Sequence, residues 1–321
     1  QKRLERSHHR YNYYKWPMFH FCVGKTSGKT SVLHVDFDCI ILDAWSAKLL
    51  LNEIFSLYYG KDVKFPRISF MNYMRLKTDK GDLEAEEYWK EKVKNMPSFP
   101  KLNYQKKFAE VQNVRFDRIE CDFSFIETQR LYQKIKNYHF TPAAVISTIF
   151  MKTLAQYSET PGLSINVTLF NRQLLHEDVN GILGEFTNNA VISYQEKTDS
   201  LLDAIRATQE QMWRLVQYRK FEGSNILKML SSGRAGKAIM PVVFTCMLEG
   251  NVSKVTKKRY SFKEEYAISQ TPQVVLDHHV RDDLGYLKIS WDYIIDIFDK
   301  QYITDIFGAY VNNIKKFMEK Y

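Results

Sequence analysis

The chain has 321 residues and a formal net charge of +9, and 45% of its residues are hydrophobic and 14% aromatic. This composition excludes a largely disordered protein and allows one large or two medium domains. The positive charge favours an acidic partner, but the basic residues are spread along the chain without an RNA- or DNA-binding motif, so we expect no nucleic acid partner.

The four cysteines, Cys22, Cys39, Cys121 and Cys246, are far apart in the sequence and form no CxxC pair. A zinc site or a disulfide framework is therefore not expected, and buried, reduced thiols are. No apolar stretch is long enough to cross a bilayer, and the first residues lack a signal peptide. The sequence predicts a soluble, cytoplasmic protein without a membrane partner.

The first part of the chain predicts a β-hairpin and two helices. Residues 1–15 are typical of the end of a basic helix and a turn. The two strands of the hairpin, Pro17–Val23 and Ser31–Phe37, mix β-branched and aromatic residues around a polar turn at Lys25–Lys29. Helices are predicted where apolar residues recur at helical spacing, at Ala44–Tyr59 and Leu83–Met96. The segment Ser98–Asn113 is interpreted as a crossing linker.

After residue 113 strands and helices alternate again, which predicts a second α/β lobe. Helices are predicted at Ser124–Tyr138, Pro142–Tyr157, Leu201–Tyr218 and Lys300–Lys320, the first of them with a capping box. Strands are predicted at Arg115–Phe123, Ser164–Leu169, Ala190–Tyr194, Pro241–Leu248, Gln273–Leu276 and Tyr286–Trp291.

Two short patterns resemble known sites but carry little weight. Gly24–Thr30 (GKTSGKT) has three rather than four residues between its glycines and lies in the hairpin, so nucleotide binding is not expected. His278, His279 and Asp283 fit HHxxxD, in which the second His is the general base of chloramphenicol acetyltransferase-like acyltransferases. Because three fixed positions are weakly specific, the sequence favours a loop with two ordinary histidines here.

Asp38, Asp43 and Ser46 form a DxxxxDxxS pattern at the predicted junction of a strand and a helix. The two Asp residues span a turn, and Ser46 is placed to cap or brace the first helical residues. Asp38 is followed by the apolar run Cys39–Leu42, where a carboxylate needs a cation or hydrogen-bond donors.

This pattern resembles the signature of heterocyclisation domains of nonribosomal peptide synthetases, in which DxxxxD replaces the HHxxxDG of ordinary condensation domains. Six further segments resemble the family's motifs in the same order and cover nearly the whole chain: Trp16–Phe19 (WPMF), Tyr88–Leu102 (YW…MPSFPKL), Phe170–Thr187 (FNR…HEDV…GEFT), Pro241–Cys246 (PVVFTC), Ser269–Asp277 (SQTPQVVLD) and Gly285–Phe298 (G…WD…F). Departures from the family pattern are few: Leu174, Glu177, Glu185 and Cys246.

The resemblance implies an α/β fold of two chloramphenicol acetyltransferase-like lobes arranged in a V, with a tunnel between them. Residues 1–105 would form the N-terminal lobe, which carries the DxxxxDxxS motif, and residues 106–321 the C-terminal lobe. The family's first strands and helices would lie ahead of residue 1, so we expect the N-terminal lobe to be incomplete.

The implied activity is peptide-bond formation between two carrier-protein-bound thioesters, followed by cyclodehydration of a Cys, Ser or Thr side chain to a thiazoline or oxazoline. Donor and acceptor peptidyl carrier proteins are the expected partners, with adjacent synthetase domains. Phosphopantetheine would arrive on the carrier proteins, and no bound cofactor or metal is expected. Two alternatives remain: a plain condensation or acyltransferase domain that uses His279, and a non-catalytic docking domain for carrier proteins.

The resemblance also implies a set of catalytic residues. Asp277 is the predicted acid and base, Thr245 its relay or orienting partner, and Asn171 holds the intermediate, with Gln270 as a weaker candidate. A carboxyl group in a poorly solvated site can both give and take the protons that cyclodehydration moves. Asp277 follows the strand-like QVVL and Thr245 follows PVVF, so both are expected at strand ends.

Each of these residues also has a structural interpretation. Thr245 could bond to backbone, Asn171 could fix a turn, and Asp277 could pair with Arg172 or Arg281. The resemblance favours the catalytic interpretation for all three. Asp38, Asp43 and Ser46 are instead predicted to be architectural, with Asp43 paired to Arg10 or Arg172.

Overall fold

The computed structural model describes residues 2–26, 28, 30–77, 82–196, 200–231, 240–248, 264–271, 273–283 and 285–321. Ser27 and Lys29, in the predicted polar turn and the P-loop-like pattern, and Pro272, in the SQTPQVVLD segment, lie outside the described residues. The chain divides into two compact units, which we call unit 1 (Gln1–Gly81 with Phe170–Asn188) and unit 2 (Asp82–Leu169 with Asn189–Tyr321).

These units do not coincide with the predicted lobes. The segment Phe170–Asn188, from within the predicted C-terminal lobe, belongs to unit 1, and the helix that follows Asp82 belongs to unit 2. The boundary of the two lobes at residue 105 stays a prediction.

Unit 1 contains the predicted hairpin, in which β1 (Phe19–Lys25) pairs antiparallel with β2 (Ser31–Phe37). Its helices are α1 (Lys2–Ser7), α2 (Ala44–Tyr58), α3 (Phe70–Leu76) and the 3-10 turn η2 (Val179–Gly181). The sequence did not predict α3, because seven residues are too few for a helical period. A small core joins it to the second segment of unit 1 through Tyr73, Val179, Ile182 and Phe186.

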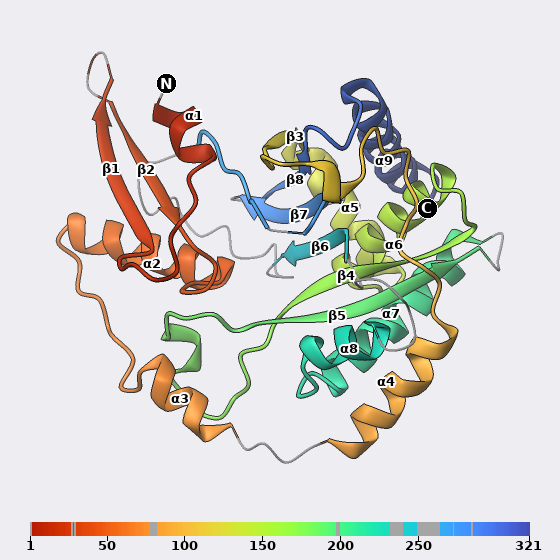
Figure 1. The fold of residues 1–321 in the computed structure, drawn as a ribbon, viewed down its shortest axis with the longest axis horizontal. Coiled ribbons are helices and arrows are strands. Elements are labelled where there is room, and N and C mark those ends of the chain that lie inside the picture. Colours follow the sequence, from red (N-terminus) through yellow and green to blue (C-terminus); the bar gives the residue numbers. More distant parts are fainter. Residues whose placement is uncertain are drawn as a thin grey trace. The chain divides into compact units, whose positions relative to one another are not determined.

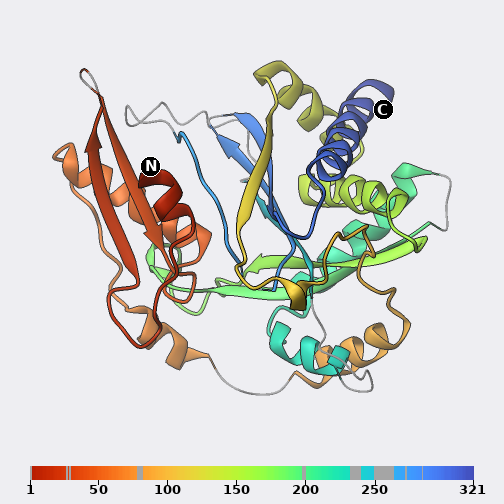
Figure 2. The same ribbon diagram turned by 45° about the horizontal axis from the view of Figure 1, so that its top comes forward.

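Unit 2 is built on a six-stranded mixed sheet, shown in Figures 1 and 2, with the strand order β3-β8-β7-β6-β4-β5. β4 and β7 run parallel to β6, which lies between them, whereas β8 runs antiparallel to both β7 and β3. The strands are β3 (Phe116–Asp122), β4 (Gly162–Phe170), β5 (Thr187–Gln195), β6 (Val242–Met247), β7 (Leu276–Asp283) and β8 (Tyr286–Ile294). The helices are α4 (Leu83–Asn95), α5 (Phe125–Asn137), α6 (Pro142–Gln156), α7 (Leu201–Gln217), α8 (Gly223–Ser231) and α9 (Lys300–Lys320), with the 3-10 turn η1 (Phe108–Glu110).

One face of this sheet is packed with aromatic side chains. Phe244, His278 and Trp291 project from β6, β7 and β8 against Phe150 of α6 and Tyr310 of α9, with ring centroids 4.5–6.2 Å apart. Figures 1 and 2 show α6 and α9 together on this side of the sheet. Because side chains alternate between the two faces of a strand, the residues next to these three point to the opposite face.

The α/β class predicted from the sequence is confirmed, and so are the helix bounds to within two residues for every predicted helix. The capping box of α5 is present: Ser124 Oγ accepts from the Glu127 N–H at 3.2 Å, and the Glu127 carboxylate accepts from the Ser124 N–H at 2.8 Å. The helix α8 was not predicted. None of the described helices is long and apolar enough to span a bilayer.

Two predictions about the segment around His278 are wrong. The predicted strand at Gln273–Leu276 lies too early, because Gln273 has a positive φ of 70°, which interrupts an extended chain, and β7 begins only at Leu276. The two histidines, expected in a loop, are in β7. The prediction of buried thiols is also wrong: Cys39 is exposed, and Cys22, Cys121 and Cys246 are half-buried.

Candidate active site

The polar face of the unit 2 sheet carries two rows of side chains that cross neighbouring strands in register. The first row consists of Asn166, Val243, Asp277, Asp292 and Arg118, one each from β4, β6, β7, β8 and β3. The second row, two residues further along the strands, contains Thr245, His279, Ser290 and Glu120. Residues far apart in the chain therefore lie side by side because the strands pair in this register.

An ion-paired chain runs through these rows. Arg118 donates to both oxygens of Asp292, from Nε to Oδ1 and from Nη2 to Oδ2, each at 2.6 Å. Both side chains are buried, with 8% and 0% of their surfaces exposed. The Ser269 N–H donates to the same Oδ2 at 2.7 Å. Such a bidentate, buried pair holds its carboxylate rigidly.

His279 joins the two carboxylates of the first row. Its Nε2 lies 3.4 Å from Asp277 Oδ2 and 3.4 Å from Asp292 Oδ2, at ion-pair distance from both. The two Asp residues face each other across β7 and β8, where like charges repel. The imidazole between them supplies the opposite charge, so positive and negative groups alternate from Arg118 to Asp277.

The electrostatics support a charged His279. Burial alone would lower its pKa, but the neighbouring Asp277 and Asp292 carboxylates outweigh burial and raise the pKa of His279 to about 9. Burial would raise the pKa of Asp292, but the hydrogen bonds from Arg118 and the nearby positive charge of His279 instead lower it. His279 is thus an imidazolium at neutral pH.

His278 is in the opposite state because it points to the opposite face of the sheet. It is fully buried, and its Nε2 shares a hydrogen bond of 2.8 Å with the Tyr310 hydroxyl. Burial, with a contribution from the charge of His279, holds the pKa of His278 well below its usual value. His278 is therefore neutral and packs in the core, whereas His279 is charged and belongs to the site.

Asp277 is 4% exposed, and its two oxygens are in different surroundings. Oδ2 accepts hydrogen bonds from Ser269 Oγ at 3.1 Å and Thr271 Oγ1 at 3.3 Å, and it is the oxygen next to His279. Oδ1 is buried and has no hydrogen-bond donor among the described residues. The carboxylate is therefore held through one oxygen and has an open hydrogen-bonding position on the other.

The other predicted catalytic residues are placed as follows. Thr245 lies within β6 rather than at its end, and its hydroxyl donates to Thr168 Oγ1 at 2.9 Å; no hydrogen bond joins these two described residues, Thr245 and Asp277. Asp277 is the second residue of β7, so its predicted position at the end of a strand is wrong too. Gln270 is half-buried between Ser269 and Thr271.

Asn171 belongs to unit 1, whereas Asp277, Thr245 and Gln270 belong to unit 2. Asn171 is 7% exposed, and its backbone N–H donates to the Phe186 carbonyl at 3.1 Å. The structure brings Asp277 and Gln270 onto neighbouring segments and pairs the strands that carry Asp277 and Thr245.

Asp277 pairs with neither Arg172 nor Arg281, the two arginines that its structural interpretation proposed as partners. Arg281 pairs with Glu264, and Arg172 pairs with Asp43. The partners of Asp277 are instead His279, Ser269 and Thr271.

The DxxxxDxxS motif forms a second buried polar cluster, in unit 1. Asp43 caps α2 by accepting from the Ser46 N–H at 2.6 Å, and its other oxygen accepts from the Phe186 N–H at 3.2 Å. Arg172 Nη2 donates to Asp43 at 3.3 Å and to Ser46 Oγ at 2.7 Å, so the predicted arginine partner is Arg172. Asp43 is therefore the cap of α2, whereas the sequence predicted that Ser46 would cap or brace the first helical residues.

Ser46 instead holds the loop at Gly184, where its Oγ accepts from the N–H at 3.0 Å and donates to the carbonyl at 2.7 Å. Asp38 lies outside this cluster. It is half-buried and accepts from the Ile40 N–H at 3.0 Å, which forms a local turn after β2.

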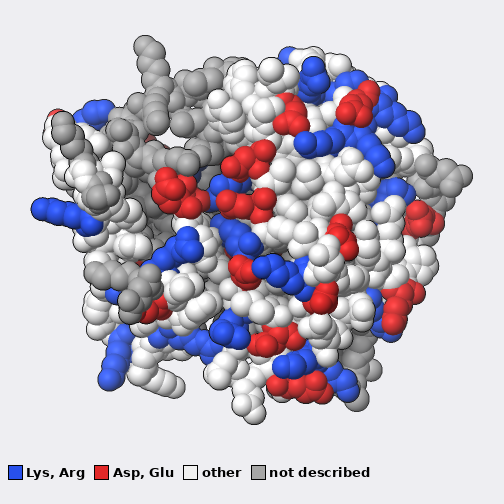
Figure 3. Space-filling model, turned by 90° about the horizontal axis from the view of Figure 1, so that it is seen from above, with Lys and Arg blue, Asp and Glu red and all other residues white. Residues whose placement is uncertain are grey.

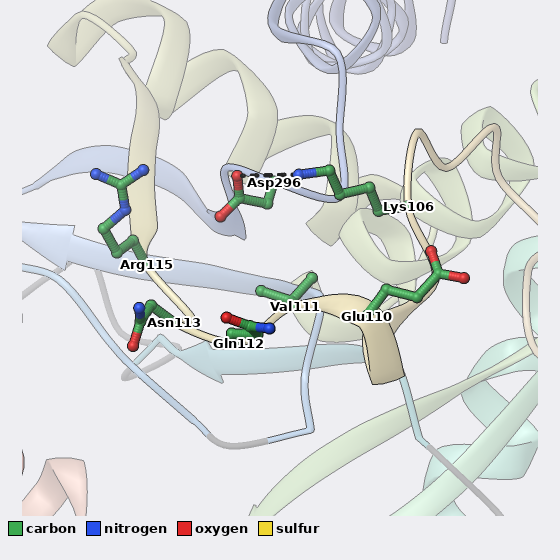
Figure 4. A pocket seen from close by; sticks show the side chains of 7 residues that line it. All are labelled: Lys106, Glu110, Val111, Gln112, Asn113, Arg115 and Asp296. Atoms are coloured by element: carbon green, nitrogen blue, oxygen red, sulfur yellow. Dashed lines mark ion pairs between the residues drawn. The ribbon is translucent and has the colours of Figure 1, made fainter.

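One hollow of unit 2 is lined by residues outside these rows. A cavity of about 550 Å³ is lined by Lys106, Glu110, Val111, Gln112, Asn113, Arg115 and Asp296, drawn in Figure 4 with the Lys106–Asp296 ion pair of 3.9 Å. None of the predicted catalytic residues lines it. Within the described ranges, no group of three or more His, Cys, Asp or Glu residues is placed to hold a metal ion.

Sequence reasoning missed three members of the ion-paired chain. Asp292 is the Asp of the WD pair in the last motif, and that motif was the available signal. His279 was set aside with the HHxxxD pattern. No sequence pattern pointed to Arg118, because it is a single basic residue in a strand and its partner Asp292 is 174 positions away.

Comparison with known proteins identifies the family of the chain. The family model of the condensation domain matches residues 2–321. The chain is 27% identical over 312 residues to bacitracin synthase 1 of Bacillus licheniformis, with 94% of this chain and 6% of that protein covered. It is 26% identical over 313 residues to the pyochelin synthetase PchF of Pseudomonas aeruginosa (94% and 17%) and over 315 residues to the phenyloxazoline synthase MbtB of Mycobacterium bovis (92% and 22%). The chain spans less than a quarter of the length of these relatives.

Solved structures show the same fold. The cyclization-docking bidomain of the EpoB nonribosomal peptide synthetase from Sorangium cellulosum superposes with a TM-score of 0.86 at 25% identity, over 99% of this chain and 65% of that one. The epimerization domain from the third module of tyrocidine synthetase B superposes with a TM-score of 0.74 at 17% identity, over 95% and 73%. The chloramphenicol acetyltransferase-like α/β fold predicted from the sequence is confirmed.

Proposed function

The chain belongs to the condensation domain family, and on that premise we propose that it catalyses heterocyclisation in a nonribosomal peptide synthetase. In this proposal it joins two thioester-bound substrates through a peptide bond. It then closes the side chain of the new Cys, Ser or Thr residue into a thiazoline or oxazoline.

Two kinds of observation support ring formation over condensation alone. Among the relatives are a phenyloxazoline synthase and a cyclization bidomain. The chain also carries the complete DxxxxDxxS motif, with Asp43 and Ser46 buried in one cluster. The HHxxxD pattern that the alternative needs lies in β7 and not at the junction of β2 and α2, where the heterocyclisation motif lies.

The proposed reaction has three steps. The acceptor amine attacks the donor thioester, which forms a C–N bond, breaks the C–S bond and releases the donor thiol with a proton from the amine. The acceptor thiol or hydroxyl then adds to the new amide carbonyl and gives a ring that bears a hydroxyl group. Loss of that hydroxyl and of the amide proton as water leaves a C=N bond.

The last step needs an acid and a base at one place, because hydroxide is a poor leaving group. We assign both roles to Asp277, and the single observation that carries the proposal is its open oxygen. Oδ2 is fixed by Ser269 and Thr271, while Oδ1 is buried and unbonded among the described residues, so we assign the proton exchange with the substrate to Oδ1. A poorly solvated position makes such an exchange more effective.

His279 is a poor candidate for the general base of the alternative reaction. A general base must be unprotonated at the working pH, and the raised pKa of His279, about 9, leaves it protonated at neutral pH. Its ring is also held between two carboxylates. Plain condensation through His279 is for this reason the second choice.

Thr245 is the second member of the proposed catalytic group in unit 2, and Asn171 of unit 1 remains a predicted catalytic residue. Thr245 presents a hydroxyl in the strand next to Asp277 and is oriented by Thr168, so it can relay a proton or bind the ring hydroxyl. Asn171 offers an amide to the intermediate, and Gln270 is a further candidate from the segment that holds Asp277. Asp38, Asp43 and Ser46 are proposed to be architectural.

The proposed partners are donor and acceptor carrier proteins, which present their substrates on phosphopantetheine arms, and adjacent synthetase domains. The net charge of +9 suits acidic carrier proteins, since opposite charges speed encounter. On the face drawn in Figure 3, however, Lys and Arg side chains are interspersed with Asp and Glu and form no separate basic area.

The test is the intact mass of the released product. Donor and cysteinyl thioesters on carrier proteins are incubated with the full-length protein, and the product is freed from its thioester. A product lighter than the linear peptide by one water supports the proposal, and Asp277→Asn should return it to the linear mass.

Two other outcomes contradict the proposal in different ways. A wild-type product of linear mass only would favour plain condensation, and His279→Ala should then abolish it. Absence of any product, with carrier proteins still binding, would favour the docking domain.

A further inference from the structure

We propose that His279 is a positioning residue for the cyclodehydration step, which holds Asp277 by bridging it to the Arg118–Asp292 pair. This inference rests on the function proposed above. It assigns to His279 a role other than that of a general base, in a part of the site that the sequence patterns did not connect to the chemistry.

The first observation is geometric. His279 Nε2 is 3.4 Å from one oxygen of Asp277 and 3.4 Å from one oxygen of Asp292. Asp292 cannot shift easily, since both its oxygens are bound by Arg118 at 2.6 Å and one also accepts from the Ser269 N–H. His279 therefore links Asp277 to a carboxylate that three hydrogen bonds hold in place.

The second observation concerns the charges. Asp277 and Asp292 are opposite each other across β7 and β8, and both are nearly fully buried. Without a cation between them, the two facing carboxylates would repel each other. The protonated His279 offsets this repulsion, so Asp277 keeps its place and the orientation of its oxygen Oδ1.

Other charged groups along this face are already satisfied. Arg281, two residues further along β7, pairs with Glu264 at 2.7 Å. Lys288 of β8 pairs with Glu120 and Asp122 of β3, each at 3.3 Å.

The remaining neighbours of His279 that the structure describes carry no charge. On β6 its neighbour in register is Thr245. In the segment at residues 264–271, Ser269 and Thr271 contribute the two hydroxyl groups that donate to Asp277. His278 points to the other face and is neutral. Among the described residues, Asp277 and Asp292 are accordingly the groups that hold the proton on His279.

The experiment compares cyclised with linear product for His279→Gln, His279→Lys and the wild type, in the full-length protein with carrier-bound donor and cysteinyl thioesters. The ratio of the two products does not depend on how much of a variant is folded, so a stability loss cannot imitate the effect. His139→Asn is the control: it also replaces a histidine of unit 2 by an amide, its side chain is exposed, and Asn tolerates the φ of 56° at that position.

We expect His279→Gln to lower the ratio of cyclised to linear product about tenfold or more, as for other groups that orient a catalytic side chain. His279→Lys, which restores a cation, should recover part of the ratio, and His139→Asn should match the wild type.

Two results would overturn the inference, and they are distinguishable. If the wild type cyclises and His279→Gln shows the same ratio, or His279→Lys recovers none of a lowered ratio, Asp277 needs no cationic bridge and only the role of His279 is lost. If the wild type yields linear product alone, the proposed function is lost and the inference with it.

Discussion

Arg118 and Asp292 face each other in register across β3 and β8 and share two hydrogen bonds of 2.6 Å, although 174 residues separate them in the chain. Their side chains are 8% and 0% exposed, so water does little to screen either charge. The pair closes one end of the ion-paired chain that leads through His279 to Asp277. Its rigidity is the basis of the site, and the predictions below test it and its neighbours.

Arg118→Met should lower the free energy of unfolding by about 3–5 kcal/mol, because it leaves the Asp292 carboxylate buried without its partner. The measurement is the shift of the urea midpoint at constant slope. Arg206→Met is the matched control: Arg206 pairs with Asp203 on the surface of α7, where the two side chains are 61% and 52% exposed. We expect that variant to lose less than about 1 kcal/mol. Equal losses in the two variants would contradict the structural importance of the Arg118–Asp292 pair.

The raised pKa of His279 predicts a pH-dependent stability. Since the folded protein binds this proton more tightly than the unfolded chain, the stabilisation is complete below the ordinary pKa of 6.5 and is lost as pH rises through about 9. The difference in unfolding free energy between the wild type and His279→Gln should therefore shrink by about 3 kcal/mol over this interval. Thermal unfolding of both proteins at pH 6 to 10 measures it. A difference that stays constant over this range would mean that His279 is neutral in the fold.

His278 predicts a loss of stability at acid pH, in contrast to the loss at alkaline pH that His279 predicts. Its pKa is held well below the ordinary value, so the folded protein resists protonation and loses stability as pH falls below about 6.5. His278→Phe, which keeps an aromatic ring against Phe150 and Tyr310, should remove this acid-side loss in melting curves taken at pH 4.5 to 7. The hydrogen bond to the Tyr310 hydroxyl would be lost as well, at a cost of about 1 kcal/mol at neutral pH. If His278→Phe loses as much stability at acid pH as the wild type, groups other than His278 cause that loss.

Asp43→Ala should destabilise unit 1 and abolish both condensation and ring formation. The substitution removes the cap of α2 and leaves Arg172 buried without its carboxylate, which together cost about 3–5 kcal/mol. Asp38→Ala is the matched control in the same motif. It removes one local hydrogen bond at a half-buried position and should cost about 1 kcal/mol. Normal condensation by a fully folded Asp43→Ala protein would refute an architectural role.

Thr245→Val should leave condensation intact and reduce ring formation about a hundredfold or more, the range for loss of a group that transfers a proton. Thr168→Val tests how Thr245 is oriented, since the two hydroxyls are 2.9 Å apart. If Thr168 acts only through Thr245, the double variant should be no slower than Thr245→Val alone. The product ratio by mass spectrometry separates the two steps. A Thr245→Val protein with the wild-type ratio would remove Thr245 from the mechanism.

Local signals in the sequence determined most of the helices. The capping box at Ser124, the helical period of Ala44–Tyr59 and the amphipathic Lys300–Lys320 depend on residues within a few positions of one another, and all three predictions are confirmed. The short helices α3 and α8 lacked such signals. The β7 strand was predicted too early because the apolar segment that leads into it, QVVL, resembles a strand until the turn conformation of Gln273 is known.

The sequence by itself determined the family, through ordered motifs, and it named Asp277, Thr245 and the DxxxxDxxS residues as candidates. Only the tertiary structure decided how they are connected. It selected Arg172 over Arg10 for Asp43, and it joined Asp277 to His279, Asp292 and Arg118. The physical reason is that strand register and burial set these electrostatic partners: alternation along β7 sends His278 into the core and His279 between two carboxylates, and no local pattern in HHVRDD encodes which strand lies beside it.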